Sequence, residues 1–181
     1  NAKTLIDIGS NKGQSILITK KFFPNIQVYS FEPLEDQINI QKKIINNENI
    51  FYHNLAIGNK DEFSSIYITN RKDSSSLLKP INIINSNYIT KEIQKVEIKK
   101  LDSFKELMNI RRPSIMKIDV QGFELEVLEG SELVLNNIDY IIIEISFTEV
   151  YHNQKLQDKI INFLNSKNFN LKYRCNESFI N

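Results

Sequence analysis

A polar turn near the start of the chain carries the first residue types that could bind a ligand. Gly9 and Gly13 flank Ser10 and Asn11, and Asp7 precedes them within a short apolar segment. Glycine permits positive φ and lets a ligand approach the backbone closely, and a helix after the turn would direct its free N–H groups toward it. The spacing is neither the dinucleotide G-x-G-x-x-G nor a P-loop, since no Gly-Lys-Ser/Thr follows. The turn indicates a site for a polar or anionic cofactor, with a purely structural turn as the alternative.

Glu32 is the second candidate, because it ends an apolar segment and stands 23 positions after Gly9. In doubly wound folds, an acidic residue about 20 positions beyond the glycine turn accepts hydrogen bonds from ribose hydroxyls. Phe31 and Pro33 fix the strand end on either side of Glu32. We therefore interpret Glu32 as a nucleotide-binding carboxylate, the alternative being a surface glutamate at a strand end.

Two more carboxylates follow apolar segments later in the chain. Lys117 and Asp119 are two positions apart and so share one face of a predicted strand, which is costly in a buried strand unless the two are paired or used. Glu144 ends the apolar run of the next strand, and His152 follows it as a weaker candidate. Two carboxylates at one rim of a sheet can act as acid and base or hold a divalent cation. A purely structural Lys–Asp pair is the alternative.

The elements that must position these residues alternate between strands and helices. Such alternation favours a parallel sheet with helical crossovers, and hence an α/β fold. A polar stretch, residues 70–90, interrupts it and is either a substrate flap or a solvated loop. We find no linker and no internal repeat, so residues 1–181 read as one domain. The predicted strands are 5–8, 28–31, 50–57, 64–69, 95–101, 114–120, 140–146 and 171–175, and the predicted helices are 15–23, 34–47, a short one opened by Ser103, 124–135 and one capped by Asn153.

Length and composition narrow the function classes further. The chain has 181 residues, of which 41% are hydrophobic and 25% charged, as in ordinary globular domains. A net charge of +1 gives no field for binding nucleic acid, and no apolar run approaches the roughly 20 residues of a membrane span. Cys175 is the single cysteine, which favours a reducing compartment and a cytoplasmic location. Because the chain starts at Asn1 almost directly in a strand, we expect it to be truncated at its N-terminus.

Taken together, the motifs resemble the FkbM family of S-adenosylmethionine-dependent methyltransferases. Each piece is short, but they fall in the family's order and extend from about Lys3 to Phe147. The matching pieces are LIDIGSNKG (5–13), FEP (31–33), AIG (56–58), SSL (75–77), LDSF (101–104), KIDVQGFE (117–124), VLEG (127–130) and the strand ending in Glu144.

The resemblance implies a class I methyltransferase fold: a Rossmann-like three-layer sandwich with a mostly parallel twisted sheet and helices on both faces. It implies S-adenosylmethionine as cofactor and a small-molecule or glycan acceptor, with O-methylation of a hydroxyl on a sugar or glycan as our working hypothesis. Within that hypothesis Asp119 is the first choice for the general base, Glu144 supports it, and His152 is third. The cofactor-binding set implied is Asp7, Gly9, Ser10, Asn11 and Gly13 at the methionine end, Glu32 at the ribose, Ala56 near Asn54 at the adenine, and Asp119.

Two departures from the family pattern stand out. Gln121 occupies a position where the family usually has glutamate, so the charge is lost, and Gln121 can still form hydrogen bonds but cannot act as a base. Ser10 replaces a common alanine, which is a mild change. The final strand of the fold is expected to be short or missing, because the chain ends soon after its predicted last strand.

Three alternatives remain open from the sequence. Mg²⁺ could assist the reaction, although no third ligand of suitable spacing is found beside the two carboxylates. The chain could be another nucleotide-dependent enzyme, such as an NAD-dependent dehydrogenase, against which the missing G-x-G-x-x-G counts. It could also be a non-catalytic binding module on a degenerate methyltransferase fold, for which Gln121 leaves room. The acceptor and the oligomeric state are not indicated by the sequence.

Overall fold

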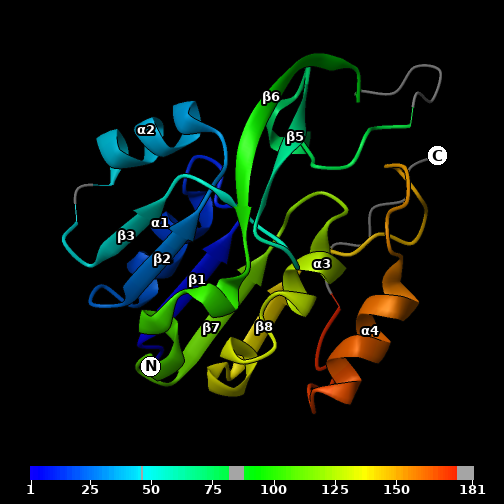
Figure 1. The fold of residues 1–181 in the computed structure, drawn as a ribbon. Helices are drawn as coiled ribbons and strands as arrows, with labels where there is room; N and C mark the ends of the chain where they lie inside the picture. The colour runs from blue at the N-terminus through cyan, green and yellow to red at the C-terminus, as the bar shows by residue number, and fades with distance from the viewer. Residues whose placement is uncertain (46, 82–87, 175–181) are drawn as a thin grey trace.

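The computed structural model describes residues 1–45, 47–81 and 88–174. Its main sheet has five parallel strands in the order β3-β2-β1-β7-β8 (Figure 1). The order runs outward in both directions from β1, so the sheet is doubly wound and the reversal lies between β1 and β7. These strands are β1 (Thr4–Ile8), β2 (Gln27–Phe31), β3 (Ile50–His53), β7 (Ser114–Ile118) and β8 (Tyr140–Ile143).

Helices cover both faces of this sheet, which confirms the predicted α/β three-layer fold. Alternate residues of β1 point to opposite faces: Leu5 packs with Ile16 on one side, and Ile6 and Ile8 pack with Leu128 on the other. The first face carries α1 (Gln14–Phe22) and α2 (Glu35–Ile44), and the second carries α3 (Glu124–Glu129) and α4 (Gln157–Ser166). No helix among the described residues has the length and apolar content needed to cross a membrane.

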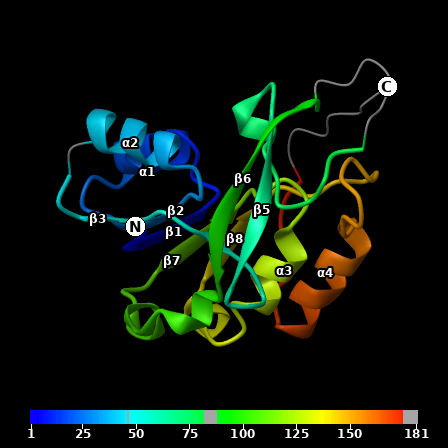
Figure 2. The same ribbon diagram turned by 45° about the horizontal axis from the view of Figure 1, so that its top comes forward.

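A second, three-stranded sheet rises above the carboxyl ends of the main strands (Figures 1 and 2). Its order is β4-β6-β5, with β4 (Ala56–Ile57) parallel and β5 (Glu62–Thr69) antiparallel to β6 (Thr90–Lys99). The prediction of one strand over 50–57 was therefore wrong. The Asn54 amide donates to the main-chain oxygens of Glu32 and Pro33, so the chain leaves the main sheet there and β4 pairs with β6 instead.

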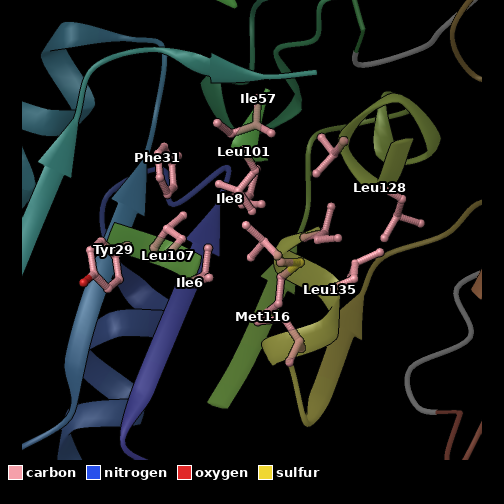
Figure 3. Close-up of a cluster of buried hydrophobic side chains, with 14 of the residues drawn as sticks. Ile6, Ile8, Tyr29, Phe31, Ile57, Leu101, Leu107, Met116, Leu128 and Leu135 are labelled. Atoms are coloured by element: carbon pink, nitrogen blue, oxygen red, sulfur yellow. The ribbon is translucent and has the colours of Figure 1, made fainter. Parts of the chain in front are cut away.

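The larger hydrophobic core joins the two sheets. Figure 3 shows side chains of β1, β2 and β7 in one cluster with Ile57 of the small sheet and with residues of η2 (Leu101–Ser103), η3 (Lys105–Asn109) and α3. Ile8, Phe31 and Ile57 are each about 1% exposed. This packing fixes the carboxyl ends of β1 and β2 against β4, which is where the candidate site lies.

Several other predicted elements differ from the structure. The helix predicted over 124–135 divides into α3 and a 3-10 turn, η4 (Val134–Asn137), because the Asp102 carboxylate accepts hydrogen bonds from the N–H groups of Leu133 and Val134 and starts a new turn. The helix after Asn153 begins only at Gln157, since Asn153 has φ of +65°. The short helix at Ser103 is 3-10 rather than α. Residues 171–174 are not in a strand, and Cys175 lies outside the described residues.

Candidate active site

One cleft opens where the strand order reverses, between the carboxyl ends of the main strands and the small sheet. It is partly open to solvent and is lined by residues of both sheets. Ile8, Phe31 and Ile57 contribute apolar walls. Five of the residues predicted to bind a cofactor line it: Gly9, Asn11, Glu32, Ala56 and Asp119.

Gly9 allows the ends of β1 and β7 to approach each other at the floor of this cleft. It has φ of +74°, and a Cβ atom built on it would lie 1.9 Å from the main-chain oxygen of Asp119. The Lys117 ammonium adds a second link by donating to the Gly9 oxygen at 3.0 Å. Gly9 therefore positions Asp119 beside the turn, and no side chain fits in its place.

Replacing Gly9 by alanine is expected to lower the free energy of unfolding by about 3 kcal/mol or more, because backbone strain and a clash with main chain add. Gly13→Ala is the matched comparison: Gly13 also has positive φ, but its added Cβ meets only side-chain atoms of Ile45 and Gln41. Urea denaturation followed by circular dichroism measures both. Equal losses in the two variants would contradict this account of Gly9.

The other three predicted cofactor residues lie behind the turn and do not line the cleft. Asp7 is fully buried, accepts a hydrogen bond from the Ser15 hydroxyl at 2.6 Å and pairs with Lys117 at 3.5 Å. Burial raises the pKa of Asp7, and the Lys117 charge opposes that rise. Ser10 faces the opposite side of the sheet, where its hydroxyl meets Ser30 at 2.7 Å and the Gln41 amide at 2.8 Å. Asp7, Ser10 and Gly13 thus stabilise the turn on the side away from the cleft.

Glu32 is almost fully buried at the end of β2, where its two carboxylate oxygens accept hydrogen bonds from the N–H groups of Asn11 and Leu34, each at 2.9 Å. Burial raises the pKa of Glu32 to about 7, while the two backbone donors oppose the rise. A carboxylate has about four acceptor positions, so Glu32 can take further hydrogen bonds from a ligand in the cleft.

Three buried polar side-chain atoms in the cleft lining have no hydrogen-bond partner: Asn11 Oδ1, Gln37 Oε1 and Ser75 Oγ. Buried polar atoms are normally satisfied, so these three atoms are available to hydrogen-bond a polar ligand in the cleft. Gln37 was not among the residues predicted from the sequence. Its only sequence signal is the spacing of four positions to Gln41, which puts the two on one face of a helix; in the structure both are buried in α2.

Asp119 and Glu144 come together as predicted, at the ends of the paired strands β7 and β8. The last residues of these strands, Ile118 and Ile143, are in register, and the Glu144 N–H donates to the Ile118 oxygen at 3.0 Å. The Gln121 amide nitrogen lies 2.8 Å from Asp119 Oδ1 and 3.4 Å from Glu144 Oε2. Desolvation, followed by the negative charge of Asp119, raises the pKa of Glu144 to about 7.

The Lys117–Asp119 pair, the structural alternative for these residues, also exists, with Nζ and Oδ2 3.3 Å apart. Lys117 therefore bridges the ends of β1 and β7 through Asp7 and Asp119. Asp119 itself lines the cleft, so this ion pair does not remove it from the site. Among the described residues, no group of three or more His, Cys, Asp or Glu side chains is arranged to hold a metal ion.

His152 is exposed and does not line the cleft. The preceding Tyr151 does not line the cleft either, but it is 2% exposed and contacts Gln121, whose amide lies beside both carboxylates. The Tyr151 hydroxyl lies 3.2 Å from Gln121 Oε1 and 2.9 Å from the Ser74 oxygen. His152 was a weaker candidate because it follows Glu144 in the sequence. The structure places Tyr151, rather than His152, in contact with Gln121.

The stretch predicted as a flap or loop, 70–90, includes residues 82–87, which lie outside the described residues. Its described part, residues 70–81, is called the flap segment below. Asp73, Ser75, Ser76 and Leu77 of this segment line the cleft. The segment is tied to the region of Tyr151 by hydrogen bonds from Ile81 N to Val150 O and from His152 N to Lys79 O, each 2.9 Å.

Comparison with known proteins shows the family to which the sequence belongs. The sequence matches the Methyltransferase FkbM domain over residues 7–174. "Methyltransferase 1" of Beauveria bassiana is 26% identical over an alignment of 161 residues, with 78% of this chain and 64% of that protein covered. "Hexuronic acid methyltransferase AglP" of Haloferax volcanii is 29% identical over an alignment of 83 residues, with 42% of this chain and 35% of that protein covered. The chain therefore spans less than two thirds of the length of either relative.

Among solved structures, a protein assigned as an S-adenosylmethionine-dependent methyltransferase from Listeria monocytogenes aligns with a TM-score of 0.39 and 9% identity, covering 91% of this chain and 62% of that one. The family match rests on sequence and extends over most of the chain, including the glycine turn, Glu32 and the strand end at Asp119. The protein belongs to the FkbM methyltransferase family.

Proposed function

We propose that this chain is an S-adenosylmethionine-dependent O-methyltransferase that acts on a hydroxyl group of a sugar or glycan. The observation that carries the proposal is the cleft at the strand reversal. Unpartnered polar atoms and the buried Glu32 carboxylate line it, and the Asp119 and Glu144 carboxylates lie at its edge. The family match supports methyl transfer. The name of the Haloferax volcanii relative, a hexuronic acid methyltransferase, supports a sugar acceptor.

The residues present fit S-adenosylmethionine. Glu32 would accept hydrogen bonds from the ribose hydroxyls, and the apolar wall at Ala56 would adjoin the adenine. Asn11 and Gln37 offer unpartnered side-chain oxygens to amino or hydroxyl donors of the ligand, and the Ser75 hydroxyl can donate or accept. Gly9, held against β7, would leave room for the methionine end of the ligand.

Bound S-adenosylmethionine supplies an electrophilic methyl group on a sulfonium, with the sulfur as leaving atom. The chain must align an acceptor hydroxyl with that methyl carbon, which can supply about 7–11 kcal/mol of the barrier, and must take up the hydroxyl proton. Asp119 lines the cleft and would accept this proton as the new C–O bond forms and the C–S bond breaks. Glu144 is exposed and would share the proton and pass it to water. The flap segment would cover the acceptor.

An acceptor screen tests this function. We expect transfer of a tritiated methyl group from S-adenosylmethionine to free hydroxyls in a panel of cell-surface sugars, including hexuronic acids. Fully O-methylated versions of the same sugars are the controls and are expected to receive no label. Tight cofactor binding with no transfer to any sugar or small hydroxyl compound would instead favour a non-catalytic binding module. Loss of transfer in EDTA would point to the metal-assisted variant.

A further inference from the structure

The main chain at Gln121 has a left-handed conformation that neighbouring hydrogen bonds hold in place. Gln121 has φ of +56° and Gly122 has φ of +103°, so the turn after Asp119 passes through the left-handed region twice. The buried Glu124 carboxylate accepts hydrogen bonds from the N–H groups of Val120 and Gly122, at 3.3 and 2.9 Å. The Ser76 hydroxyl of the flap segment donates to the main-chain oxygen of Gln121 at 2.6 Å. This turn aims the Gln121 side chain between the two strand ends.

The Gln121 amide has one chemically consistent orientation. Its nitrogen faces Asp119 Oδ1 and Glu144 Oε2, both of which only accept hydrogen bonds when ionised. Its oxygen faces the Tyr151 hydroxyl. Burial raises the pKa of Tyr151, so this hydroxyl stays protonated and remains a donor. A glutamate at position 121 would place a third acceptor where the structure uses a donor.

Tyr151 is itself fixed on two sides. Its ring packs against Gly122, where an added Cβ would lie 3.1 Å from Tyr151 Cδ2. Its hydroxyl also lies 2.9 Å from the main-chain oxygen of Ser74 in the flap segment. The hydroxyl proton is therefore shared between that oxygen and Gln121 Oε1. The contacts therefore form a continuous chain from the flap segment through Tyr151 and Gln121 to the two carboxylates.

We infer that Gln121 is a positioning residue that links the Asp119 and Glu144 carboxylates into one proton-sharing pair, and that Tyr151 and the flap segment hold its amide in the donating orientation. The inference deepens the proposed function, on which it rests for the role of the pair in proton uptake. It assigns a use to the glutamine at position 121.

Several charged groups around Glu144 affect its pKa, and a test of Gln121 must separate its effect from theirs. Asp119 and Glu124 are negative and favour protonation of Glu144, whereas Lys117 is positive and opposes it. Tyr151 adds no charge while it is protonated. The amide of Gln121 donates to the ionised carboxylates, and hydrogen bonds of this kind lower a carboxyl pKa. Removing the donor or replacing it by a charge should therefore move the titration of Glu144 upward by different amounts.

Carbon-13 NMR of the side-chain carboxyls of the free chain, without cofactor or acceptor, measures this directly. Loss of a signal in Glu144→Gln and in Asp119→Asn assigns the pair. We expect Gln121→Met to raise the pKa of Glu144 by about half a unit or more through loss of the donor, and Gln121→Glu to raise it by more than about one unit through the added negative charge. Tyr151→Phe is expected to give a smaller upward shift. Gln94→Glu, an exposed site on β6, adds the same charge elsewhere and is expected to leave the titration unchanged.

An unchanged Glu144 titration in both Gln121→Met and Gln121→Glu would overturn the inference. Thermal melting shows whether each variant is folded, and if Gln121→Glu does not fold, Gln121→Met and Tyr151→Phe decide the question alone. Failure of the proposed function would be seen in a different measurement, the binding of S-adenosylmethionine. Absence of S-adenosylmethionine binding by the wild-type chain would remove that function while leaving the carboxyl titrations as described.

Discussion

Asp119→Asn is expected to lower kcat for methyl transfer by about 10²–10⁴-fold, the range that a general base contributes, with S-adenosylmethionine affinity retained within about tenfold. The side chain keeps its size and one oxygen toward Gln121, but it can no longer accept the hydroxyl proton. Lys117 retains its second partner, Asp7, so the ends of β1 and β7 stay linked. Single-turnover kinetics with labelled cofactor and calorimetric affinity separate the two quantities.

Asp158→Asn is the matched control for that variant, because Asp158 is exposed in the first turn of α4 and far from the cleft lining. Its kcat is expected to equal that of the wild type. Near-wild-type turnover in Asp119→Asn, with cofactor affinity unchanged, would remove Asp119 from the chemistry.

Glu32→Gln is expected to weaken S-adenosylmethionine binding by about 10- to 150-fold, which corresponds to losing a charge-assisted hydrogen bond of about 1.5–3 kcal/mol. The pH dependence of S-adenosylmethionine affinity gives a second, independent prediction. The pKa of Glu32 is raised to about 7, and the protonated acid is the poorer acceptor for ribose hydroxyls. Affinity of the wild type is therefore expected to fall as pH decreases through 7, and this contribution is absent in the variant.

Calorimetric titrations at several pH values between 6 and 8 check both parts of the Glu32 prediction. Glu35→Gln serves as the control, because Glu35 is an exposed acid in the first turn of α2, three positions further along the chain. Equal dissociation constants for Glu32→Gln and the control would rule out Glu32 as the ribose-binding residue.

The parts of the fold that could be predicted depend on local signals. Gly9 and Pro33 mark the ends of β1 and β2, and the alternation of strands and helices is sufficient to predict a parallel sheet. The neighbouring positions of Asp119 and Glu144 followed from one rule, that adjacent parallel strands end at the same rim. No such rule indicates where a segment such as 50–57 divides, because both halves form strands and only the pairing of β4 with β6 separates them.

The direction of individual side chains was less predictable, because it depends on packing between elements distant in sequence. Ser10 belongs to the glycine turn but faces Gln41 of α2, on the other side of the sheet. Tyr151 reaches Gln121 only because the flap segment holds the chain beside it. Sequence spacing places such residues near a site, but tertiary contacts decide which of them enter it.

Calorimetric titration of the wild-type chain with S-adenosylmethionine, S-adenosylhomocysteine and NAD tests the central claim most directly. The proposed cofactor site predicts saturable binding of S-adenosylmethionine and S-adenosylhomocysteine at a single site, weakened in Glu32→Gln, and no saturable binding of NAD. Saturable binding of NAD, with no heat from either of the other two ligands, would contradict it.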